Sequence, residues 1–183
     1  MKIVFLTGSN RIGATSTILA KAMAMRMERM QVEASVFDLA EWPLPFYSPD
    51  DSYEHHDGVQ RLSRLMREAD GIVLTTPEYH GSVSGVLKNA LDFLGQEHFA
   101  GKPVLSVSSS GGAVGTSSLT QLQTIVRNLH GVNSPEWVSI GGAQRARYEQ
   151  LENAELDARS EHGMETFLQL VGKLVRREDV TVR

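Results

Sequence analysis

The sequence contains no cysteine in its 183 residues. Disulfide bonds, thiolate nucleophiles, iron–sulfur clusters and thiolate zinc sites are therefore excluded, and the composition fits a reducing compartment. Long apolar runs are also missing, and the N-terminal stretch MKIVFLTGSN has too few apolar residues for a signal peptide. We therefore expect a cytoplasmic protein that has no membrane partner.

An excess of positive charge is missing as well. The net charge is −4 and the pI is about 5.9, so no basic surface is available to gather nucleic acid or anionic lipid. No group of His, Asp and Glu residues has the spacing of a metal site, and we predict no bound metal. The length and the 41% apolar content fit one globular unit, so we predict a single domain over residues 1–183.

What the sequence does contain is a regular alternation of strand-like and helix-like segments. The predicted strands are apolar runs at Lys2–Thr7, Val32–Phe37, Gly71–Thr76, Pro103–Ser108 and Trp137–Ile140. The predicted helices are Thr15–Met30, Gly58–Glu68, Val83–Leu94, Ser117–Leu129 and Leu151–Val175. This alternation predicts a three-layer α/β sandwich, with a five-stranded parallel sheet in the order 2-1-3-4-5 and helices on both faces.

Three loops that leave strands 1, 3 and 4 are rich in glycine and hydroxyl side chains, and the fold brings them to one edge of the sheet. The first, TGSNRIGATST, leads into a helix N-terminus, whose free N–H groups attract anions. It lacks both a Walker lysine and the three glycines of a dinucleotide fingerprint, which favours a monophosphate. Simple helix capping would explain one hydroxyl rather than several, so we favour an anion site. Its candidate residues are Ser9, Arg11, Ser16 and Thr17.

The second and third loops, TPEYHGSVSG and SSSGGAVGTSS, suit a flat ligand. Backbone N–H groups of the second loop can serve the polar edge of a heterocycle, with Tyr79 beside it, and Gly81 permits close approach. Glu78 and His80 suggest acid–base chemistry, but spacing alone favours a simpler interpretation. In that interpretation both side chains are exposed or bonded to neighbouring backbone.

These same segments resemble a known family. GSNRIGATST, TPEYHGSVSGVLKNALDFL and KPVLSVSSSGGAVGTSSLTQL resemble, in order and spacing, motifs of the NAD(P)H-dependent FMN reductases, a flavodoxin-like group that includes small quinone, azo-dye and chromate reductases. The resemblance covers most of residues 1–140 and implies non-covalent FMN. By position, the residues implied to hold the cofactor are Ser9, Arg11, Ser16 and Thr17 at the phosphate; Pro77, Glu78, Tyr79, His80 and Gly81 along the isoalloxazine; and Ser109, Gly111 and Gly112 on its other side.

The chain departs from the family pattern at three positions, with His80 where asparagine is usual, Ser84 where proline is usual and Phe93 where tryptophan is common. The resemblance implies an oxidoreductase that passes hydride from NADPH or NADH through FMN to a small acceptor such as a quinone, azo compound, chromate or free flavin. No catalytic side chain is predicted, because the flavin carries the chemistry. The family further implies a homodimer or homotetramer.

Two alternatives stay open from the sequence. A flavodoxin-type electron carrier would bind FMN but exchange electrons only with proteins, and such carriers are typically more acidic than this chain. A flavin-binding sensor would turn over nicotinamide nucleotides only incidentally.

Overall fold

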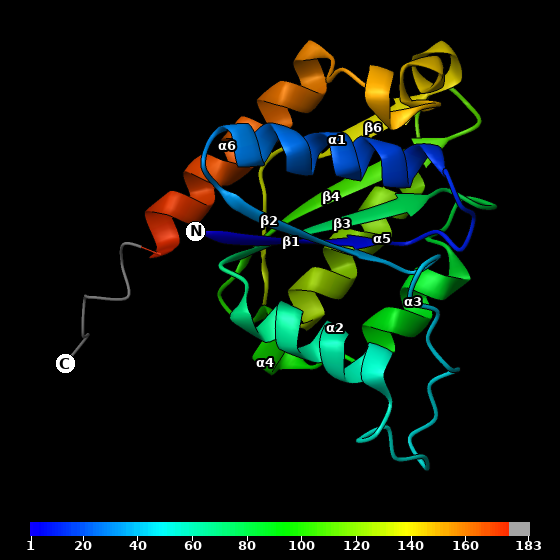
Figure 1. Ribbon diagram of the computed structural model, residues 1–183, viewed down its shortest axis with the longest axis vertical. Coiled ribbons are helices and arrows are strands. Elements are labelled where there is room, and N and C mark those ends of the chain that lie inside the picture. The colour runs from blue at the N-terminus through cyan, green and yellow to red at the C-terminus, as the bar shows by residue number, and fades with distance from the viewer. Residues whose placement is uncertain (176–183) are drawn as a thin grey trace.

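The computed structural model describes residues 1–175 and shows a parallel sheet between two layers of helices (Figure 1). The strands are β1 (Lys2–Thr7), β2 (Glu33–Asp38), β3 (Gly71–Pro77), β4 (Pro103–Ser110), β5 (Val132–Asn133) and β6 (Val138–Gly141). Their order is β2-β1-β3-β4-β5, with β6 also paired to β4, and every pairing is parallel. The predicted fold class and strand order are confirmed. Residues 176–183 of the predicted domain lie outside the described residues.

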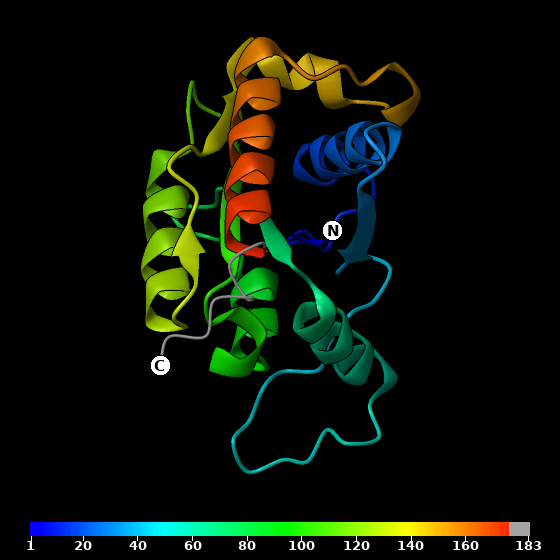
Figure 2. The same cartoon turned by 90° about the vertical axis from the view of Figure 1, so that its left-hand side faces the viewer.

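Helices cover both faces of the sheet. They are α1 (Thr15–Arg29), α2 (Asp57–Glu68), α3 (Gly85–Asp92), α4 (Gln96–Phe99), α5 (Thr116–Asn128) and α6 (Ala158–Val175), with 3₁₀ helices η1 (Gly142–Tyr148) and η2 (Leu151–Asn153). Helices α1 and α6 lie on one face, and α2 to α5 lie on the other (Figures 1 and 2). The prediction of one helix from Leu151 was wrong in its start, since α6 begins at Ala158.

Two short strands pair with β4 at the end of the sheet, where only one, Trp137–Ile140, was predicted. β5 pairs with the start of β4, and β6 pairs with its last four residues, from Val107 to Ser110. Pro135 lies between the two short strands and has no N–H to donate to a sheet ladder, so continuous pairing stops there. The predicted strand Trp137–Ile140 corresponds to β6, displaced by one residue.

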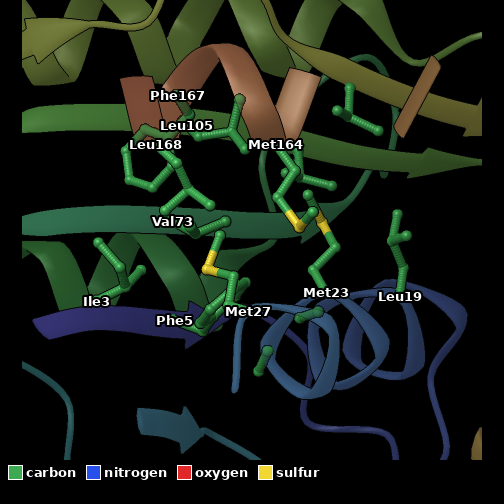
Figure 3. Close-up of a cluster of buried hydrophobic side chains, with 14 of the residues drawn as sticks. Ile3, Phe5, Leu19, Met23, Met27, Val73, Leu105, Met164, Phe167 and Leu168 are labelled. Atoms are coloured by element: carbon green, nitrogen blue, oxygen red, sulfur yellow. The ribbon is translucent and has the colours of Figure 1, made fainter. Parts of the chain in front are cut away.

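The core below α1 and α6 fixes these helices against the sheet (Figure 3). Met23 and Met27 of α1 and Phe167 of α6 are fully buried, in the same cluster as Phe5 of β1. Each such side chain contributes roughly 1.5–3 kcal/mol by leaving water. This packing holds the first turn of α1 in place beside the carboxyl end of β1.

The sheet register brings the three polar loops together. Thr7 at the end of β1 is opposite Thr75 of β3, and Pro77 at the end of β3 is opposite Ser109 of β4. Ligands of such sheets bind outside the carboxyl ends of the strands. Across residues 1–175, none of the helices combines the length and apolar character that crossing a bilayer requires. The same residues contain no grouping of three or more His, Asp or Glu suited to a metal ion.

Candidate functional site

A cavity of about 290 Å³ lies at this edge of the sheet, between the loops that follow β1, β3 and β4. Its lining combines predicted site residues from all three loops with several that the sequence did not indicate. The predicted residues are Arg11, Ser16, Pro77, Glu78, Tyr79, Ser109 and Gly111. The additional ones are Ala14, Thr15, Ser110 and Arg145. The predicted residues that do not line the cavity are Ser9, Thr17, His80, Gly81 and Gly112.

The first turn of α1 presents hydrogen-bonding groups that lack partners. The residue at its N-cap is Ala14, and no side chain caps the helix. Ser16 and Thr17 are 1% and 3% exposed, and within the described residues their hydroxyls make no hydrogen bond. Leaving a buried polar group unpaired costs about 1–3 kcal/mol. The capping interpretation is therefore wrong, and the geometry favours a ligand that these hydroxyls and the free N–H groups bind.

Two other predicted residues shape this loop. The hydroxyl oxygen of Ser9 is buried and accepts a hydrogen bond of 3.1 Å from the backbone N–H of Arg11. Arg11 itself is exposed at the cavity wall, where its guanidinium can reach an anion. Ser9 thus fixes the backbone that carries the arginine.

Glu78 connects the other two loops. Its N–H donates to the carbonyl of Ser109 at 2.8 Å, and its carboxylate accepts from the N–H and hydroxyl of Ser118 at 2.9 and 3.0 Å. The carboxylate therefore caps the first turn of α5, where a negative charge is favourable. This supports the interpretation of Glu78 as a residue bonded to backbone rather than an acid or base.

Tyr79, His80, Gly81 and Ser82 form a tight turn. Tyr79 and Ser82 exchange two backbone hydrogen bonds of 3.0 Å, and the two central residues have φ values of +53° and +71°. Such angles define a type I′ turn, which asparagine and glycine adopt most readily. His80 is exposed, as the simpler interpretation expected, while the half-exposed ring of Tyr79 forms a cavity wall.

The third loop contributes backbone more than side chains. Ser109 and Gly111 line the cavity, whereas Gly112 does not. The carbonyl of Gly112 accepts a 2.8 Å hydrogen bond from the N–H of Gly142, and its own N–H donates to the hydroxyl of Ser110 at 3.1 Å. These bonds attach the loop to the start of η1.

Ser84, one of the departures from the family pattern, joins three elements. Its hydroxyl donates to the carbonyl of Gly8 and accepts from the N–H of Leu87, which caps α3. Its own N–H donates to the hydroxyl of Thr76 at 3.0 Å. Proline could make none of these three bonds. Ser84 therefore ties the loop after β1 to β3 and α3.

Of the four additional cavity residues, Arg145 is the one that lies outside the three loops indicated by the sequence. It lies on η1, in a polar stretch without a motif, and no spacing rule connects it to the three loops. Only the fold brings η1 beside the loop after β4.

A second cavity of about 430 Å³ adjoins the first and shares Tyr79 as a wall. Its other lining residues are mostly apolar, and none is Lys, Arg, Asp or Glu: Asn10, Leu39, Pro43, Leu44, Phe46, Ser84, Gly85, Val86 and Asn89. Asn89 fixes the loop after β2 by donating to the carbonyl of Pro45 and accepting from the N–H of Tyr47, at 2.8 and 2.9 Å. Phe46 is consequently held at the rim with 92% of its surface exposed.

Comparisons with known proteins agree with this geometry. Residues 1–145 match the sequence profile of the family described as NADPH-dependent FMN reductase. The chain is 35% identical over 153 residues to the FMN-dependent NADPH-azoreductase of Staphylococcus aureus (strain USA300), covering 81% of each protein. It is 37% identical over 143 residues to the enzyme of the same name from Staphylococcus saprophyticus subsp. saprophyticus, covering 76% of each.

Solved structures show the same fold at low sequence identity. FerB, a flavoenzyme NAD(P)H:(acceptor) oxidoreductase from Paracoccus denitrificans, aligns with a TM-score of 0.75 at 22% identity, over 96% of this chain and 97% of that one. A flavodoxin from the domain Archaea aligns with a TM-score of 0.64 at 12% identity, over 96% of this chain and 99% of that one.

Proposed function

The chain belongs to the family of NADPH-dependent FMN reductases, and on this premise we propose that the 290 Å³ cavity holds FMN, with its phosphate at the first turn of α1. The family makes the protein an NAD(P)H-dependent oxidoreductase with FMN as its cofactor. The residues that we assign to the cofactor are those indicated by the sequence: Ser9, Arg11, Ser16, Thr17, Pro77, Glu78, Tyr79, His80, Gly81, Ser109, Gly111 and Gly112.

The observation that carries the proposal is the buried, unpartnered hydroxyl of Ser16, which lines the cavity at an uncapped helix N-terminus, with the equally unpartnered hydroxyl of Thr17 in the same turn. A phosphate accepts several hydrogen bonds and is stabilised by the positive end of the helix dipole. Arg11 adds a full positive charge at the same cavity. The residues present therefore fit a phosphomonoester.

The remaining residues of the site orient and enclose the ring of the cofactor. When bound, FMN supplies the hydride chemistry that side chains of this site lack. Glu78 holds the loops after β3 and β4 together, so that backbone groups at Tyr79 and Gly111 stay fixed around a flat ring. Such prior ordering lowers the entropic cost of bringing reactants together.

We place the electron acceptor in the 430 Å³ cavity that shares Tyr79 with the cofactor site. Leu39, Leu44 and Val86 provide apolar walls, and Asn10 provides a polar amide. Pockets of this kind bind small organic molecules. Since no cationic side chain lines it, the cavity favours an uncharged quinone or azo compound over the chromate anion.

We further propose that residues 1–183 act as one FMN-binding domain in the cytoplasm and assemble as a homodimer or homotetramer. The support for assembly is a groove of about 490 Å³ between α3 and α5, where Val83 and Ile125 lie among polar residues. The size-exclusion elution volume, compared with standards, tests this part of the proposal.

The test of the FMN site uses the unpartnered hydroxyls themselves. A Ser16→Ala, Thr17→Val double variant should bind FMN about 10- to 100-fold more weakly, since two hydrogen bonds to a charged group are lost. Its FMN-free form should be as stable as the parent or more stable, because two buried unpaired hydroxyls disappear. Isothermal titration and urea unfolding measure the two quantities, with the exposed Ser52→Ala as control. Unchanged FMN affinity in the double variant contradicts the proposal.

A further inference from the structure

The 3₁₀ helix η1 is held close to the loop after β4. A Cβ atom on Gly141 would collide with the carbonyl oxygens of Gly112 and Ala113, so glycine permits this close approach. The N–H of Gly142, whose φ is +50°, then donates to the carbonyl of Gly112 at 2.8 Å. At its other end η1 is anchored by the fully buried ring of Tyr148. The position of η1 is therefore set at both ends.

Arg145 of this fixed helix lines the cavity that we assign to FMN. A Cβ built on Gly111 would lie 4.0 Å from its Nη1, so the guanidinium reaches the loop after β4. Its Nε is buried and makes no hydrogen bond within the described residues. A charged donor that is buried without a partner is costly, and a bound anion would remove that cost.

The charged side chains around the cavity also favour a bound anion. Arg11 lines the cavity from the first loop and Arg145 from η1, and within residues 1–175 neither forms an ion pair. The carboxylate of Glu78 is the acidic group of the lining, and it already accepts two hydrogen bonds from Ser118. With Glu78 counted, the charged side chains of the lining still leave an excess of positive charge, which favours an anionic ligand.

We propose that Arg145 is a second phosphate-binding arginine, which acts with Arg11 on the phosphate of FMN. This inference rests on the proposed function. The phosphate is the group of FMN that approaches two negative charges at neutral pH. Helix η1 also packs against α1, whose first turn carries the free hydroxyls. Arginine, unlike lysine, can donate two parallel hydrogen bonds to phosphate oxygens.

The experiment compares FMN with riboflavin, which has the same ring system and no phosphate. We expect Arg145→Gln to weaken FMN binding about 10- to 100-fold, the effect of losing one charge-assisted contact. Riboflavin affinity should change less than about twofold, within the error of such titrations. Fluorescence quenching of each flavin by the cofactor-free protein gives both dissociation constants. Arg145→Lys should lie between the parent and Arg145→Gln.

The control is Arg147→Gln, which removes an exposed arginine of the same 3₁₀ helix that does not line the cavity. It should leave both affinities unchanged, and the thermal melting temperature of each cofactor-free variant should match that of the parent. If Arg145→Gln weakens FMN and riboflavin equally, or affects neither, the phosphate assignment is wrong while the proposed function stands. If the parent protein binds no FMN, the proposed function fails together with this inference.

Discussion

Removal of the Ser84 hydroxyl should destabilise the protein and loosen the loop after β1. The side chain is 2% exposed, donates to the carbonyl of Gly8 and accepts from the N–H of Leu87. Loss of an N-cap costs typically ~1 kcal/mol. The carbonyl of Gly8 would be left unpaired in the interior, which costs about 1–3 kcal/mol more. We therefore expect Ser84→Ala to lower the free energy of unfolding by about 2–4 kcal/mol.

Urea unfolding followed by circular dichroism measures this loss, and the exposed Ser117→Ala in the first turn of α5 is the control. Ser84→Pro distinguishes the loss of the hydrogen bonds from a backbone effect, because the φ of Ser84 is −63° and proline adopts this angle without strain. Proline gains only about 0.4–1 kcal/mol from the unfolded state, so this variant should also be destabilised. Parent-like stability of either variant would refute the assignment of these hydrogen bonds.

Three further predictions concern other parts of the molecule. At φ +53°, His80→Asn should keep or raise stability, whereas His80→Val should lose about 1–2 kcal/mol in urea unfolding. Burial lowers the pKa of His98 below its ordinary value of 6.5, so as the pH falls the unfolded chain takes up a proton before the folded chain does. The free energy of unfolding should therefore be constant above about pH 6.5 and decrease below it. His98→Gln should weaken this pH dependence, measured as the thermal melting temperature at several pH values. Asn89→Leu should release the loop around Phe46, and limited proteolysis should then cleave it faster than in the parent.

The sheet was predictable because buried parallel strands are apolar almost throughout, as in Lys2–Thr7 and Gly71–Pro77. The end of the sheet was predicted only in part, since the expected strand Trp137–Ile140 corresponds to β6, while β5 on the other side of Pro135 pairs with a different part of β4. Helix α4 and strand β5 were missed because four and two residues carry too little periodicity. The start of α6 was missed because the preceding polar stretch forms 3₁₀ turns.

The candidate site was also predictable only in part. Its three loops could be found from the sequence, because parallel strands bring their carboxyl ends to one edge of the sheet. The sequence could not show which hydroxyls are buried without a hydrogen-bond partner. Ser9 and Ser16 look alike in the sequence, but only the hydroxyl of Ser16 is unpaired. Arg145 has no motif and reaches the cavity through tertiary packing.

The central claim is that this site binds FMN and reduces it with a free nicotinamide nucleotide. The most direct measurement is the visible absorbance spectrum of the purified protein with stoichiometric FMN, recorded anaerobically before and after addition of NADPH and, separately, NADH. The account predicts that the flavin bands bleach within seconds with at least one of the two nucleotides. FMN that binds but stays oxidised with both would contradict the reductase and favour an electron carrier, and FMN that does not bind would contradict the site itself.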